Sequence, residues 1–228
     1  MSAYLYAIVD GLPPGWRPPA GVDGGAVATR LLDGLAVVAG AVDRVPEATP
    51  KTAALHHDVV ASALDAAALL PLRYGVAVPD GELAGWVAAQ AGLLRASLDR
   101  VRNRVEMSVK LLRLGGAPGR RPARGAAPPL EERELRALAE HLVERAGLAE
   151  WRWRPSGTGN VAASVAFLVE RGDLGDFLAR IAPVATRASG VAVVPTGPWP
   201  AYSFAPPLER RPLVAADPPD LTDRRQAG

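Results

Sequence analysis

Apolar side chains alternate, or cover both faces, along short stretches in the first half of the chain, and each stretch predicts a strand. The first stretch, residues 3–9, is apolar on both faces, which is typical of a central strand. Strict alternation would group Tyr4, Tyr6 and Ile8 on one of these faces. Further strands are predicted over residues 35–42, 69–76 and 105–111.

Two helices separate the later strands, because apolar residues recur at helical spacing over residues 51–68 and again from Leu83 to Val101. Asp80 is placed to cap the second helix with its side-chain oxygen. The predicted order of elements in this first unit is therefore ββαβαβ.

Composition changes sharply after this unit. The stretch from Gly115 to Pro129 is made almost entirely of Gly, Pro, Ala and Arg and has no hydrophobic period, so we expect a flexible linker at 115–129. We predict an N-terminal domain over residues 1–114 and a C-terminal domain over residues 130–205. Residues 206–228 are rich in proline and charge, and we expect them to be disordered.

The C-terminal unit has the pattern αββαβ. A helix around residues 135–146 precedes two strands that begin at Trp151 and Val161 and are joined by a turn at residues 156–160. A second helix follows Asp173, and the last strand begins at Val191. If the strand at 105–111 were shared with this unit, the order would become βαββαβ, the ferredoxin-like order.

These patterns predict an α+β fold of two domains, each an antiparallel or mixed sheet with helices on one face. The C-terminal half is expected to be ferredoxin-like, and the N-terminal half a modified ferredoxin-like unit.

Composition narrows the classes of function. The 228 residues include no cysteine, which excludes thiol chemistry and disulfides and favours a reducing cytosol. No uncharged apolar stretch approaches the roughly 20 residues of a membrane-spanning helix, so we expect a soluble protein without membrane contact. Acidic residues are interleaved with arginine and the net charge is only +2, which disfavours nucleic-acid binding.

No arrangement typical of catalysis or of cofactor binding is present. The three histidines are His56, His57 and His141; adjacent helical histidines point about 100° apart and cannot easily share a metal ion. The chain has neither a phosphate-cradling glycine loop nor a nucleophile elbow. We therefore expect no catalytic, metal-binding or cofactor-binding residues.

Three charged residues are placed unusually. Glu106 and Lys110 lie four apart on a predicted strand, so they face the same side, most simply a solvated face of the sheet. Arg73 interrupts an apolar strand beside Tyr74, where structural pairing in a partly buried place is favoured over partner recognition.

The segment Thr196-Gly-Pro-Trp-Pro-Ala-Tyr-Ser-Phe204, here called the arm, combines three aromatic residues with two prolines. Such a stiff, apolar arm either fastens the last strand or docks on a partner.

The arm resembles the Gly-Pro-Trp-Pro-Pro-Tyr-Ser-Phe signature of the gas vesicle protein F/L family, with Ala201 in place of one proline. Other segments resemble this family in the same order: residues 4–9, the run from His56 to Gly75, and the pair Glu106 and Lys110. The residues of the matching motifs, and the candidate partner contacts, are Tyr4, Tyr6, His56, Arg73, Tyr74, Glu106, Lys110, Trp199, Tyr202 and Phe204.

The resemblance implies a cytoplasmic accessory protein of gas vesicle assembly. Its partners would be the very apolar shell protein and possibly other accessory proteins, and neither ATP nor a metal would be required. The resemblance also allows a minor structural component on the inner surface of the shell. From another class, a small-metabolite-binding protein or enzyme stays open and would require a cleft around Arg73, Glu106 and Lys110.

Overall fold

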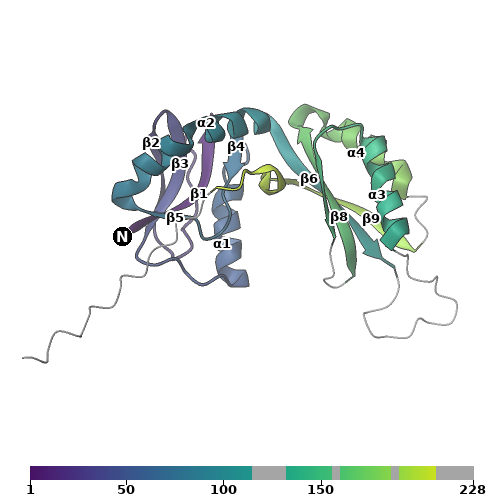
Figure 1. Ribbon diagram of the computed structural model, residues 1–228, viewed down its shortest axis with the longest axis horizontal. Helices are drawn as coiled ribbons and strands as arrows, with labels where there is room; N and C mark the ends of the chain where they lie inside the picture. Colours follow the sequence, from purple (N-terminus) through teal and green to yellow (C-terminus); the bar gives the residue numbers. More distant parts are fainter. Residues whose placement is uncertain (115–131, 156–159, 186–189, 209–228) are drawn as a thin grey trace, which may run out of the picture.

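The computed structural model describes residues 1–114, 132–155, 160–185 and 190–208. These residues form an α+β structure of two domains, which lie side by side along the long axis and have one sheet each (Figure 1). The expected linker at residues 115–129, the turn residues 156–159 and the tail beyond residue 208 lie outside the described residues.

Strand β1 (Ser2–Asp10) is the central strand of the first sheet, as its two apolar faces predicted. It pairs antiparallel with β3 (Leu35–Val42) on one side and with β4 (Ala68–Pro71) and β5 (Ala77–Pro79) on the other. Residues 2–9 of β1 are all buried, so this strand forms the middle of the domain.

Helices α1 (Pro50–Ala61) and α2 (Leu83–Val101) cover opposite faces of the first sheet. The prediction of helices on one face is therefore wrong for this domain, because β1 presents apolar side chains on both sides. Asp80 does not cap α2. It lies in the short 3-10 helix Asp80–Glu82 and forms an ion pair with Arg30.

A register shift in β1 decides which side chains share a face. The pairing with β3 is irregular between Leu5 and Ala7, so strict alternation is lost there. Ile8 consequently packs with Leu5 in the core beside α2, whereas Tyr4 and Tyr6 lie in the core beside α1. The prediction that Ile8 shares a face with the two tyrosines is therefore wrong.

Strand β2 (Val27–Leu32) was not predicted. It forms a hairpin with β3 in which Leu32 pairs with Leu35, so only Asp33 and Gly34 make the turn. Both turn residues have positive φ angles, 48° and 72°. An Asp-Gly turn of this kind matches the right-handed twist of the flanking strands.

The strand predicted over residues 69–76 forms only at residues 69–71, within β4, and β5 begins after residue 76; the two strands pair with different parts of β1. Gly75 lies in the connecting turn at a φ of +88°, a left-handed conformation that glycine adopts readily. Arg73 and Tyr74 therefore stand on a turn and not within a strand.

The strand predicted over residues 105–111 belongs to the second sheet. Strand β6 (Arg104–Arg113) lies between β8 (Val161–Glu170) and β9 (Val191–Trp199), and β7 (Trp151–Pro155) forms the edge beyond β8. This corrects the placement of β6 in the N-terminal unit. The central strand β1 already has partners on both sides, and the apolar face of β6 is completed by β8 and β9.

With β6 included, the second domain has the order β6-α3-β7-β8-α4-β9 and the ferredoxin-like sheet order. Helices α3 (Glu132–Ala146) and α4 (Leu174–Ala185) cover the face that points away from the first domain (Figure 1). Their core includes Phe167 and Phe177, whose ring centroids are 5.3 Å apart.

Candidate functional site

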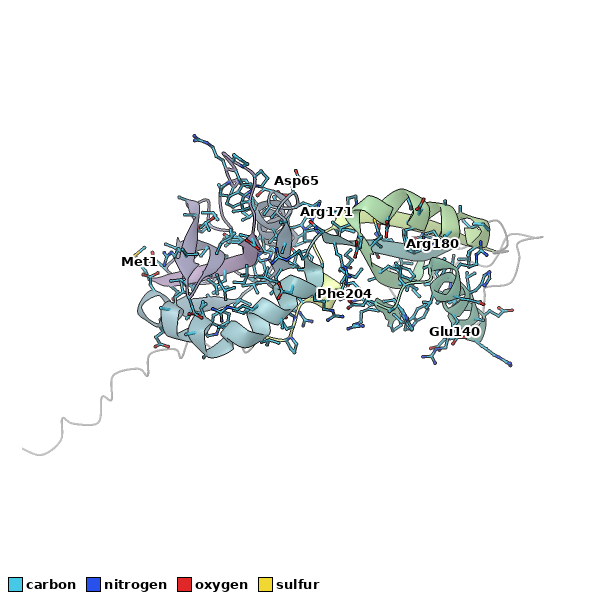
Figure 2. The ribbon with its side chains drawn as sticks, turned by 90° about the horizontal axis from the view of Figure 1, so that it is seen from above. Met1, Asp65, Glu140, Arg171, Arg180 and Phe204 are labelled. Carbon is cyan, nitrogen blue, oxygen red and sulfur yellow. The ribbon has the colours of Figure 1, made fainter. Side chains whose placement is uncertain are left out.

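The arm, residues 196–204, joins the two domains. Its first part completes β9 in the second sheet, and its last part is the short 3-10 helix Tyr202–Phe204. Ala201 and Phe204 are only 2% and 3% exposed and belong to the core that α2 forms with the first sheet. Figure 2 shows Phe204 between the domains. The arm is therefore docked within the molecule.

The carboxylate of Glu106 on β6 holds the arm in place. It accepts one hydrogen bond from the backbone N–H of Ser203 at 2.7 Å and another from the Ser203 hydroxyl at 2.6 Å. Glu106 is 8% exposed, so the expected solvated face is wrong for this residue. These hydrogen bonds offset the cost of removing a carboxylate from water.

Gly197 allows β9 to pass close to β6. Its φ is +125°, and a Cβ atom there would lie 2.8 Å from the carbonyl oxygen of Glu106 and 2.9 Å from the sulfur of Met107. The pairing of the two strands is irregular at this point, between Glu106 and Ser108. A side chain at position 197 would have to displace these atoms, so glycine is favoured where the arm leaves the sheet.

Two guanidinium groups flank the ring of Phe204. The Cζ atoms of Arg100 on α2 and Arg152 on β7 lie 5.6 and 5.4 Å from the ring centroid, within the range of cation–π attraction. One arginine comes from each domain, so the ring of Phe204 is a contact point for both.

Further polar contacts cross between the domains. Arg100 forms an ion pair with Glu150, which precedes β7. On the other side of the contact, Arg171 donates hydrogen bonds to the carbonyl oxygens of Leu64 and Ala66, and Figure 2 shows Arg171 close to that segment of the first domain. Together with the arm, these contacts fix the two sheets relative to each other.

His56 on α1 is a buried structural residue. Its Nε2–H donates to the carbonyl oxygen of Leu72 at 3.0 Å, because a carbonyl can only accept, and its Nδ1 accepts from the Tyr4 hydroxyl at 3.0 Å. Burial is the main reason that the pKa of His56 falls from 6.5 to about 4; the hydrogen bond to the Leu72 carbonyl opposes this shift, and the neighbouring His57 adds to it. The imidazole is therefore neutral at pH 7, with both nitrogens occupied.

The predicted aromatic residues Tyr4, Tyr6 and Tyr74 gather around this histidine. The ring of Tyr6 stacks on His56 at 5.4 Å, and the rings of Tyr4 and Tyr74 each meet it edge-on at 5.7 Å. The hydroxyls of Tyr4 and Tyr6 also accept backbone N–H groups, from Gly75 and Val22. Burial raises the pKa of both tyrosines.

Trp199 and Tyr202 of the arm meet α1 through His57, whose ring centroid lies 5.8 Å from Trp199 and 6.0 Å from Tyr202. The hydroxyl of Tyr202 is buried and has no hydrogen-bond partner among the described residues. Burial, and then the charge of Glu106, raise the pKa of Tyr202. Trp199 remains 41% exposed, so the arm keeps one aromatic side chain at the surface.

A profile of the family described as gas vesicle synthesis protein GvpL/GvpF matches residues 2–117 and 120–206. The chain belongs to the GvpL/GvpF family. No curated protein sequence matches the chain significantly.

Two crystal structures of GvpF resemble this GvpL/GvpF family member. The gas vesicle protein GvpF from Anabaena sp. PCC7120 has 16% sequence identity and a TM-score of 0.73, over 92% of this chain and 98% of that chain. The GvpF of Microcystis aeruginosa has 15% identity and a TM-score of 0.70, over 90% and 99%. At this identity the likeness establishes the fold.

Two of the predicted contact residues do not join the arm site. Arg73 is exposed, and among the described residues it forms no ion pair, so the expected pairing in a partly buried place is corrected. Lys110 is exposed on β6, whereas Glu106 is buried under Ser203, and the two do not bond to each other among the described residues. The aromatic candidates and His56 do come together, in and beside the arm.

Several residues of this GvpL/GvpF site were missed from the sequence. Ser203, Arg100, Arg152 and Glu150 acquire their roles only because the arm reaches the first domain. The docked segment also continues beyond the arm: Leu208, which was predicted to be in a disordered tail, packs against the first core.

The described parts of the chain contain no group of three or more His, Asp or Glu side chains suited to hold a metal ion. Within those same parts, none of the helices combines the length and the apolar character needed to cross a bilayer.

Proposed function

We propose that this protein binds the apolar gas vesicle shell protein in the cytoplasm and supports nucleation or assembly of the shell without catalysing a reaction. The observation that carries the proposal is the family match, which extends over nearly all of residues 2–206. An accessory role fits a chain in which both domains, and not one isolated motif, carry the family's pattern.

The physical basis is the aggregation of apolar surface in water. A shell subunit with an uncovered apolar face associates with itself, and a protein that covers the face keeps the subunit available for assembly. The chain offers apolar side chains at the surface for such contact. Leu31 is 76% exposed on the edge strand β2, Trp199 is 41% exposed on the arm, and Trp151 is 39% exposed on the edge strand β7.

The hydrogen bonds of two buried titratable residues support a role without catalysis. His56 has both ring nitrogens in hydrogen bonds, and Glu106 is engaged by Ser203. Each of these groups stabilises the docked aromatic cluster or the arm, so neither is free to transfer a proton to a substrate.

The proposal is tested by capture of purified shell protein on the immobilised full-length chain. Saturable capture is expected, and absence of capture at any concentration contradicts the proposal. Analysis of purified, washed vesicles then decides between two roles. An assembly factor is removed by washing, whereas a minor component of the inner shell surface is retained.

A further inference from the structure

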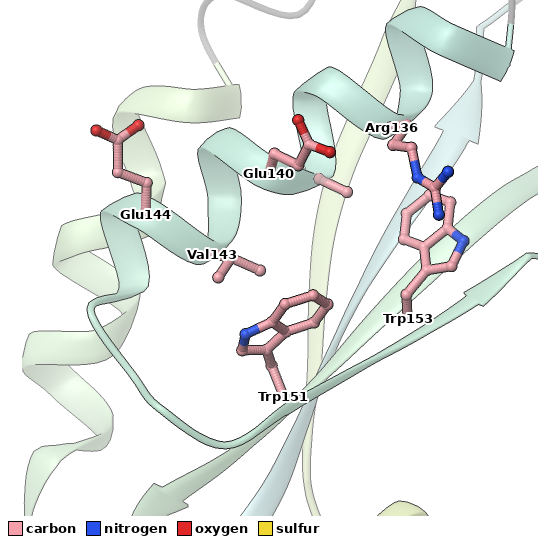
Figure 3. Close-up of a pocket in the computed structure, with 7 residues that line it drawn as sticks. Arg136, Glu140, Val143, Glu144, Trp151 and Trp153 are labelled. Carbon is pink, nitrogen blue, oxygen red and sulfur yellow. The ribbon is translucent and has the colours of Figure 1, made fainter.

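A groove runs between helix α3 and the edge strand β7 of the second domain, on the face away from the arm. Its volume is about 480 Å³. Figure 3 shows the two tryptophans of β7 rising toward the helix. The lining residues are Arg136, Ala139, Glu140, Val143, Glu144, Trp151 and Trp153.

The floor of the groove is apolar and aromatic. Trp151 is 39% exposed and Trp153 is half-buried, and they pack beside Ala139 and Val143 of α3. Neither indole N–H has a hydrogen-bond partner among the described residues. Tryptophan is among the residue types most enriched at the hot spots of protein interfaces. Here each tryptophan is partly covered and keeps an N–H that a partner could bind.

The rim of the groove carries a defined charge pattern. Glu140 and Glu144 project from α3 on one side, and Arg136 lines the groove at the end where Trp153 lies (Figure 3). Glu144 contacts the imidazole of His141 at 3.4 Å, and the side chain of Glu144 is 80% exposed. A ligand with a basic side chain beside an apolar surface would complement the two carboxylates.

The edge strand itself is poorly suited to accept another strand. β7 has only five residues, alternates its tryptophans with Arg152 and Arg154, and ends at Pro155. Short edge strands with charged residues and proline resist strand addition. A helix that lies along α3 and rests its apolar stripe on the tryptophans avoids this obstacle.

We propose that the groove binds an amphipathic helix of the shell protein, with apolar residues on Trp151 and Trp153 and a lysine or arginine beside Glu140 and Glu144. This inference rests on the proposed function, because it names the place and the mode of shell-protein binding. In this proposal the second domain, and not the arm, contacts the shell protein.

The test measures the affinity of solubilised shell protein for the wild-type chain and for two groove variants. Trp151→Ala removes part of the apolar floor, and Glu140→Lys combined with Glu144→Lys reverses the rim at exposed positions. Each is expected to weaken binding at least about tenfold, the effect of losing one interface anchor. The matched control combines Asp43→Lys and Glu47→Lys, which makes the same change of net charge on an exposed loop of the first domain, and is expected to bind as the wild type does.

The outcomes separate the two proposals. If shell protein binds the wild type and the Glu140/Glu144 double variant equally, the groove is not the site, although the proposed function stands. If shell protein does not bind the wild type, both proposals fail. If the wild type forms a dimer that Trp151→Ala dissociates, a second copy occupies the groove and the helix proposal is overturned. Should Trp151→Ala fail to fold, the charge reversal alone decides.

Discussion

The carboxylate of Glu106 binds both the backbone N–H and the hydroxyl of Ser203, 97 positions further along the chain. Glu106 lies on a strand of the second sheet, and Ser203 lies in the turn that places Phe204 in the core of the first domain. One side chain therefore couples the sheet of one domain to the packing of the other.

Glu106→Ala is expected to lower the free energy of unfolding by about 2 kcal/mol, because two donors on a partly buried turn lose their acceptor. Ser203→Ala removes only the hydroxyl contact and should cost less, about 1 kcal/mol. Urea denaturation measures both. Lys110→Ala, an exposed position on the same strand, is the control and should change stability by less than about 0.5 kcal/mol. Equal effects of Glu106→Ala and Lys110→Ala would contradict the assigned role.

Phe204→Ala is expected to cost about 3 to 5 kcal/mol, since a buried aromatic ring is removed and a cavity remains. The loss should also release the arm locally, which hydrogen exchange would register as faster exchange at residues 200–208. Trp199→Phe keeps an aromatic ring at a position that is 41% exposed, so it should leave exchange in this segment nearly unchanged. Unaltered protection in Phe204→Ala would mean that the arm is held by other contacts.

The depressed pKa of His56 predicts a stability that depends on pH. Above pH 6.5 the imidazole is neutral in the folded and the unfolded chain, so stability is complete. Between pH 6.5 and about 4 the unfolded chain binds the proton and the folded protein resists it, so stability falls. Below about 4 both states are protonated and the loss levels off.

The total loss from this residue should be about 3 kcal/mol, given about 1.4 kcal/mol for each unit of pKa difference. Thermal unfolding at a series of pH values measures it. His56→Gln, which keeps polar atoms but does not titrate, should be less stable at pH 7 and should lose this pH-dependent component. The same decline in His56→Gln as in the wild type would assign the pH dependence to other groups.

Gly197→Ala is expected to destabilise the protein by about 1 to 3 kcal/mol. The new Cβ would meet the backbone of Glu106 at 2.8 Å, and a φ of +125° is unfavourable for alanine. Gly92→Ala is a suitable comparison. Gly92 lies within α2, and a Cβ added there would meet no atom of another element within 4 Å, so alanine should stabilise that helix by up to about 1 kcal/mol. If both substitutions have the same sign, the close approach at Gly197 is not important.

Local patterns predicted most of the secondary structure, and three features show where such reasoning ends. The strand β6 was recognised by alternation, but alternation does not name the sheet that a strand joins. The shift between Leu5 and Ala7 moved Ile8 to the other face, because a bulge breaks the period of two on which face assignments depend. The hairpin at Asp33 and Gly34 was detectable from its turn residues, although the exposed strand β2 lacks a clear apolar pattern.

The candidate site was predictable in its residues but not in its geometry. Composition marked the arm as stiff and apolar, and the family motifs selected Glu106 and His56. Their partners lie far away in the sequence: Ser203 for Glu106, and Tyr4 with the carbonyl of Leu72 for His56. Such pairings depend on the tertiary structure, and the hydrophobic periodicity of neighbouring residues does not predict them.

Sedimentation of purified shell protein diluted from denaturant, with and without the full-length chain, tests whether this chain binds the shell protein and keeps it soluble. We expect the soluble fraction of shell protein to rise with the concentration of this chain and to saturate at a fixed ratio. We also expect the complex to elute as one species. An equal amount of sedimented shell protein at every concentration of the chain would show that this chain does not keep it soluble.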